Sequence, residues 1–109
     1  MSRWVRYHFQ HLSRWREYAL KVARAAKDIV PDAKVYVIGG VAENRVTVLS
    51  DIDILIVVPG NRGDRGELTV RILERAIDVY GLPWDAPVEL HIAFGDEEKM
   101  YKGVRVEIG

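Results

Sequence analysis

Residues Ile52 to Val58 read IDILIVV, a run that is apolar at every position except Asp53 and is closed by Pro59 and Gly60. Apolar side chains on both faces are typical of a strand buried in the middle of a sheet. A chain of 109 residues fits one compact domain with one core, so we expect other segments of the chain to cover this strand. We therefore expect a sheet with this segment at its centre.

Strand and helix patterns surround this run. The segments Lys34–Ile38 and Val88–Phe94 are rich in β-branched and aromatic residues, which is typical of strands, and the alternating segment Val104–Ile108 predicts an edge strand. Apolar residues at steps of three and four predict amphipathic helices from Trp4 to Ile29 and from Glu67 to Tyr80. We predict an α/β (α+β) fold in which a small mixed sheet is covered by helices.

The connections predict how the strands run. The predicted helix between the second and third strands is long enough for a crossover, so these strands can be parallel, whereas the shorter connection between the first and second suits an antiparallel pair. Residues 41–49 predict a short helical turn or loop. We expect residues 1–109 to form a single domain, with an N-terminal amphipathic helix over 1–30 and the core motifs within 34–94.

Composition limits the class of protein. With 49% hydrophobic and 29% charged residues the chain is typical of a globular protein, and the absence of cysteine excludes disulfides and thiolate metal sites. Without an apolar signal segment or span, we expect a cytoplasmic protein with no membrane partner. Residues 1–30 carry seven basic and two acidic side chains, a net charge of +5. We expect these side chains to form a solvated basic face. Contact with the polyphosphate ligand or with nucleic acid is the less favoured interpretation.

Two carboxylates begin the central strand in the sequence Ser50-Asp51-Ile52-Asp53. Residues two apart in a strand point to the same side, with α carbons about 6.5 Å apart. Because a divalent cation relieves the repulsion between such groups and Mg²⁺ prefers hard oxygen ligands, Asp51 and Asp53 are candidate magnesium ligands. A solvated strand end or a capping pair is the alternative interpretation.

A glycine pair precedes these carboxylates. Gly39 and Gly40 end the first predicted strand, where a backbone without side chains allows phosphate oxygens to approach main-chain N–H groups. Ser50 offers an additional hydroxyl donor. These residues predict a triphosphate site beside the metal, although the glycine pair alone also fits a simple turn.

The stretch VYVIGGVAENRVTVLSDIDILIVV resembles the signature of the nucleotidyltransferase (DNA polymerase beta-like) superfamily, in particular its minimal, MNT-type antitoxin-like members. In that signature a glycine pair or Gly-Ser ends the first strand, and an Asp-x-Asp follows about a dozen residues later. Gly39 and Asp51 are twelve positions apart here. The resemblance extends over Val35–Phe94 and implies Glu89 as a third catalytic and metal-binding carboxylate beside Asp51 and Asp53.

The resemblance implies a magnesium-dependent enzyme that transfers a nucleoside monophosphate, with ATP as the expected donor, to a hydroxyl acceptor that can belong to a partner protein. Minimal members of the superfamily often act as antitoxins of a helical HEPN-type protein, and self-association is a further expectation. The sequence departs from the usual pattern at Gly40, Glu43 and Glu89, where Ser, Arg and Asp are common. These departures motivate the alternative of a catalytically weak or silent module that masks a HEPN-type partner.

Histidines are the remaining candidate ligands. His91 shares a strand face with Glu89, so it either borders the site or is a hydrogen-bonded structural residue, which is the interpretation we favour. His8 and His11 are three residues apart in the first predicted helix. Because no third ligand is evident near them, we expect surface or packing roles.

Overall fold

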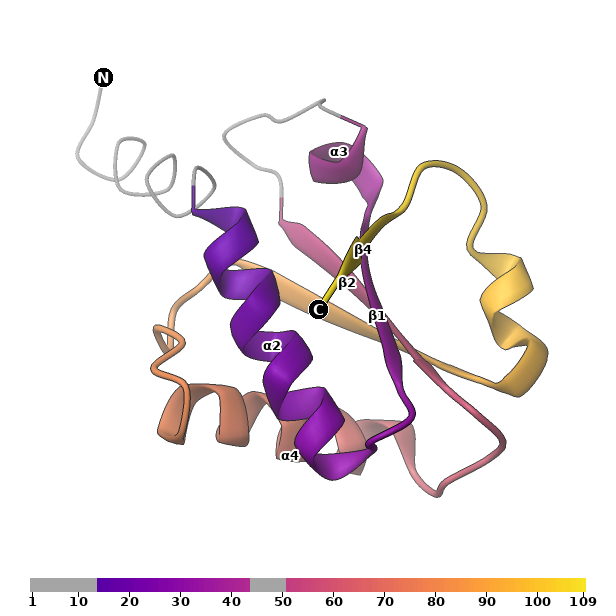
Figure 1. The fold of residues 1–109 in the computed structure, drawn as a ribbon, viewed down its shortest axis with the longest axis horizontal. Helices are drawn as coiled ribbons and strands as arrows, with labels where there is room; N and C mark the ends of the chain where they lie inside the picture. The colour runs from indigo at the N-terminus through magenta and orange to yellow at the C-terminus, as the bar shows by residue number, and fades with distance from the viewer. Residues whose placement is uncertain (1–13, 44–50) are drawn as a thin grey trace.

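The computed structural model describes residues 14–43 and 51–109, which form a four-stranded sheet with two long helices (Figure 1). The elements are α2 (Trp15–Ile29), β1 (Lys34–Ile38), α3 (Gly39–Ala42), β2 (Ile52–Val58), α4 (Arg65–Asp78), β3 (Val88–Phe94), the 3₁₀ helix η1 (Gly95–Met100) and β4 (Val106–Ile108). No helix in these two ranges is long and apolar enough to cross a bilayer.

The sheet is mixed, as predicted, with the strand order β3-β2-β1-β4. Strand β1 is antiparallel to both β2 and β4, whereas β2 and β3 are parallel and are connected through α4. The expected parallel and antiparallel pairs are thus confirmed, and β4 is the predicted edge strand, shortened to three residues. The bounds of β1, β2 and β3 agree with the predicted segments.

The two long helices differ from the predicted ranges at their ends. Helix α2 begins at Trp15, after Arg14 in a non-helical N-cap conformation, and the part of the predicted helix before Arg14, with His8 and His11, lies outside the described residues. Helix α4 begins two residues earlier than predicted because the Asp64 side chain accepts a hydrogen bond of 2.9 Å from the Glu67 N–H. That cap sets the helix start.

The faces of the sheet are covered by different elements. Helices α2 and α4 share one core cluster with the even-numbered side chains of β2, including Ile54 and Ile56. On the opposite face Leu55 and Val57 pack with Ala93, against partly buried Tyr36, Ile38 and Tyr101. Strand β2 is buried on both faces, as predicted, but the two long helices cover only one of them. The second face therefore has room for a site beside its smaller apolar cluster.

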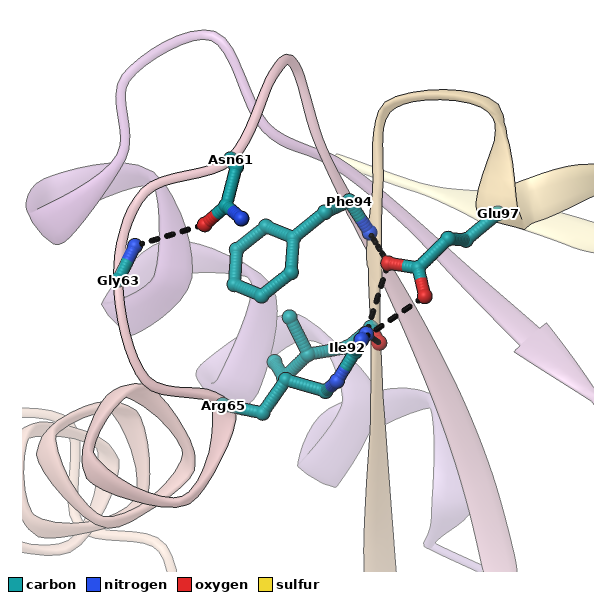
Figure 2. A network of polar contacts seen from close by, with 6 residues as sticks. All are labelled: Asn61, Gly63, Arg65, Ile92, Phe94 and Glu97. Atoms are coloured by element: carbon teal, nitrogen blue, oxygen red, sulfur yellow. Dashed lines mark hydrogen bonds and ion pairs between the residues drawn. The ribbon is translucent and has the colours of Figure 1, made fainter.

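A polar network at the end of β3 fixes the position of η1 (Figure 2). Arg65, the first residue of α4, forms a bidentate ion pair with Glu97, with N–O distances of 2.7 and 2.8 Å. Glu97 also accepts a 2.8 Å hydrogen bond from the Phe94 N–H, and the Arg65 guanidinium lies 5.0 Å from the centre of the Phe94 ring. Because η1 is joined in this way to α4 and β3, the following Tyr101 is brought over the second face of the sheet.

Candidate active site

Two carboxylates lie on neighbouring strands of the sheet. In the register of the parallel pair, Asp53 of β2 is opposite Glu89 of β3. Both positions alternate with residues of the helix-covered core, so their side chains share the face that carries Leu55 and Ala93. The Asp53 side chain is 29% exposed and Glu89 is exposed, which leaves both accessible to a ligand.

His91 lies beside the same carboxylates. Its Nε2 atom is 3.2 Å from Oδ1 of Asp53, and its ring makes an edge contact with Tyr101, with 5.9 Å between ring centres. From the sequence we favoured a structural role for His91 over a position beside the site. Its hydrogen bond to Asp53, a candidate metal ligand, places His91 at the site. The available sequence signal was its two-residue spacing from Glu89, but the contact with Asp53 depended on the register of β2 and β3.

Gly39 borders Asp53 on the other side. Its neighbour Ile38 is paired with Asp53 in the antiparallel register, and Gly39 has a φ of +70°, a conformation that residues with a side chain rarely adopt. A Cβ atom at Gly39 would lie 2.6 Å from Oδ2 of Asp53, well inside van der Waals contact. The absence of a side chain at this position therefore makes room for the Asp53 carboxylate.

The other predicted site residues have different positions. Gly40 lies within the short helix α3, which begins where β1 ends. Asp51 directly precedes β2 and is exposed, and it is not part of the cluster formed by Asp53 with Glu89 and His91. Ser50 lies outside the described residues.

Asp53, Glu89 and His91 form a donor set that fits a divalent cation. One potential ligand atom from each residue lies within 4.8 Å of those of the other two. Carboxylate oxygens are the ligands that Mg²⁺ prefers, and an imidazole nitrogen is a common ligand of transition metals. Two carboxylates this close also repel each other unless a cation or a proton lies between them. The chemistry of these side chains thus supports a metal site.

A separate cavity of about 320 Å³ lies beside α4 and the end of α2, and its lining includes Arg71, Arg75 and Val79. There Arg75 forms an ion pair with Asp28 at 2.7 Å, and the Tyr80 hydroxyl donates to the same carboxylate. These charges compensate each other within the chain. We therefore place the candidate active site at the carboxylates on the opposite face of the sheet.

Comparison with known proteins places this mixed-sheet fold in a class of nucleotide-transferring domains. Residues 20–106 match the family described as nucleotidyltransferase domain, so the chain belongs to that family. The fold is similar to a crystal structure at 1.40 Å from Sulfolobus solfataricus, a nucleotidyltransferase by provisional assignment, with a TM-score of 0.63 and 21% identity over 92% of this chain and 84% of that one. No curated protein matches the chain.

Proposed function

We propose that the protein transfers a nucleoside monophosphate, AMP from ATP, to a hydroxyl acceptor and releases pyrophosphate. The observation that carries this proposal is the pairing of Asp53 and Glu89 across adjacent parallel strands, next to the side-chain-free position Gly39. Membership of the nucleotidyltransferase family supports a nucleoside triphosphate as the substrate. Phosphoryl and nucleotidyl transfer depend mainly on positioning and charge stabilisation, which such a site can provide.

Each residue of the site has a proposed role. Asp53 and Glu89 would hold Mg²⁺, with Asp51 as a further ligand from the residue just before β2. When bound, the cation would supply charge stabilisation for the triphosphate. Glu89 is exposed and would also orient or deprotonate the acceptor hydroxyl. Gly39, Gly40 and Ser50 would contact the phosphates through main-chain N–H groups and a hydroxyl.

Transfer of label from ATP tests this proposal. The protein is incubated with Mg²⁺, ATP labelled at the α-phosphate and candidate hydroxyl acceptors, and the labelled product is compared between wild type and Asp53→Asn. Because the stabilisation lost with a metal ligand is worth several kcal/mol, we expect the variant to be slower by about 100-fold or more.

Asp96→Asn is the matched control for this assay, since it removes a carboxylate that is 95% exposed in η1 and is not a member of the metal-binding cluster. It should transfer label at the wild-type rate. Equal transfer by wild type and Asp53→Asn would exclude Asp53 from the reaction.

A second candidate function is binding of a partner protein without catalysis. Trp84 is 84% exposed, and Val70 and Val79 on and after α4 are more than half exposed, so these apolar side chains are available for contact with another protein. We propose that such a partner is of the HEPN type and that the chain is then an MNT-type antitoxin acting in the cytoplasm as one domain. The Gly40, Glu43 and Glu89 departures from the superfamily pattern favour this candidate.

The two candidates differ in which substitution matters. A masking module should lose complex formation with Trp84→Ser and keep it with Asp53→Asn, with no label transferred by either protein. An enzyme that modifies its partner should transfer label as wild type and lose that transfer with Asp53→Asn while the complex still forms. The measurements are labelled transfer and co-purification of the purified pair.

A further inference from the structure

His91 is held on both sides in a position that allows it to bind a metal. Its Nε2 faces Oδ1 of Asp53 at 3.2 Å, and the Tyr101 ring contacts it 5.9 Å away between centres. Tyr101 is itself fixed, because its carbonyl accepts a 2.8 Å hydrogen bond from Arg105. The ring contact with Tyr101 thus helps to hold the His91 imidazole with Nε2 directed at Asp53.

The distances between the donor atoms fit a shared ion. Two ligands about 2.1 Å from one ion are separated by about 3.0 Å at neighbouring corners of an octahedron and by about 3.4 Å in a tetrahedron. The observed 3.2 Å between Nε2 of His91 and Oδ1 of Asp53 lies between these values. Glu89 supplies another oxygen within 4.8 Å of both groups. Only small side-chain shifts are therefore needed for all three to reach the same cation.

We propose that His91 binds the metal directly through Nε2, alongside Asp53 and Glu89, so that it raises the preference of this site for Zn²⁺ and Co²⁺ over Mg²⁺. The inference rests on the proposed function only in locating the cation at Asp53. It adds transition metals to the Mg²⁺ of the proposed reaction, because an imidazole nitrogen favours transition metals whereas Mg²⁺ is held mainly through oxygen. The ring then carries its proton on Nδ1, since Nε2 is used for the metal.

Metal affinities measured by calorimetry without nucleotide test this preference. The background is the His8→Gln/His11→Gln variant, in which His91 is the only remaining histidine of the three in the chain. Addition of His91→Gln should lower the affinities for Zn²⁺ and Co²⁺ by about tenfold or more, by comparison with the known effects of altering metal ligation, and the Mg²⁺ affinity by less than about threefold.

An equal loss for all three ions would overturn the proposal, because it would mean that His91 only positions Asp53 by hydrogen bonding. Unchanged affinities for all of them would overturn it as well. Asp53→Asn in the same background is the matched control. It should lower the affinity for all three ions, because it removes a ligand that they share.

Proton NMR of the Co²⁺-loaded protein gives a second readout that does not require the His91 variant to fold. A coordinated imidazole should show a paramagnetically shifted, exchangeable N–H signal from Nδ1 in the background where His91 is the sole histidine. Co²⁺ binding without that signal would overturn the inference even if label transfer succeeds. The signal without any label transfer would support the inference while the proposed reaction fails, so the two outcomes are distinguishable.

Discussion

At the scale of single residues, the site depends on the absence of a side chain at Gly39. The φ of +70° requires a residue that tolerates the left-handed region, and Oδ2 of Asp53 occupies the space where a Cβ would lie, at 2.6 Å. The backbone conformation at position 39 and the nearby Asp53 side chain therefore each favour glycine there. A substitution here should affect both the stability of the fold and the position of the candidate metal ligand.

Gly39→Ala should therefore destabilise the protein and also weaken metal binding. A non-glycine residue at positive φ costs about 1–3 kcal/mol of folding free energy, and the new Cβ must displace the Asp53 carboxylate. Gly60→Ala is the matched control, because Gly60 has a φ of +71° but a Cβ added there would have no neighbouring atom within 4 Å. Urea unfolding should show similar losses for both variants, whereas titration with Co²⁺ should show weaker binding only for Gly39→Ala. Equal Co²⁺ affinities would contradict the role given to Gly39.

At the scale of elements, η1 connects the sheet to the residues that cover the second face. One end is fixed by the ion pair between Arg65 and Glu97, and the other by Arg105, which donates hydrogen bonds to the carbonyl groups of Glu98 and Tyr101. The hydrogen bond from Arg65, followed by that from the Phe94 N–H, holds the pKa of the Glu97 carboxyl below its usual value. The contribution of this network to stability must therefore depend on pH.

The sign follows from the lowered pKa of Glu97. A carboxyl with a lower pKa in the folded state stabilises the fold above its unfolded pKa of about 4.3 and loses that contribution as the pH falls through the folded value. Glu97→Gln should thus be less stable than wild type near pH 7, and the difference should shrink between about pH 5 and pH 3. Urea unfolding across this pH range measures the difference in free energy of unfolding between wild type and Glu97→Gln.

Asp96→Asn, a neighbouring exposed carboxylate in η1, controls for the change in net charge. It should not reproduce the pH-dependent difference. A gap between wild type and Glu97→Gln that stays constant down to about pH 3 would show that ionisation of Glu97 does not contribute.

At the scale of the whole molecule, the two faces of the sheet differ. One face packs against α2 and α4, and the other carries Asp53, Glu89 and His91. The apolar run of β2 was enough to predict a central strand, and the lengths of the connections were enough to predict the strand directions. The contact between His91 and Asp53 could not be predicted from local sequence patterns. The two residues are 38 positions apart, and their contact depends on the register between β2 and β3. Likewise, period-two spacing grouped Asp51 with Asp53, but Asp51 precedes the strand and is not in the cluster.

Ligand binding should stabilise the whole fold if the two carboxylates share a cation with a triphosphate. A ligand present at about ten times its dissociation constant, with no affinity for the unfolded chain, adds about 1.4 kcal/mol, which for a domain of this size corresponds to a rise in Tm of roughly 5 °C. Millimolar ATP with Mg²⁺ or Co²⁺ should produce such a shift in wild type. In Asp53→Asn the added ligand should shift the melting temperature little, because the variant lacks one of the carboxylates that would share the cation. Thermal unfolding followed by circular dichroism measures both quantities, and a wild-type curve that does not respond would count against the site itself, since binding must precede any transfer.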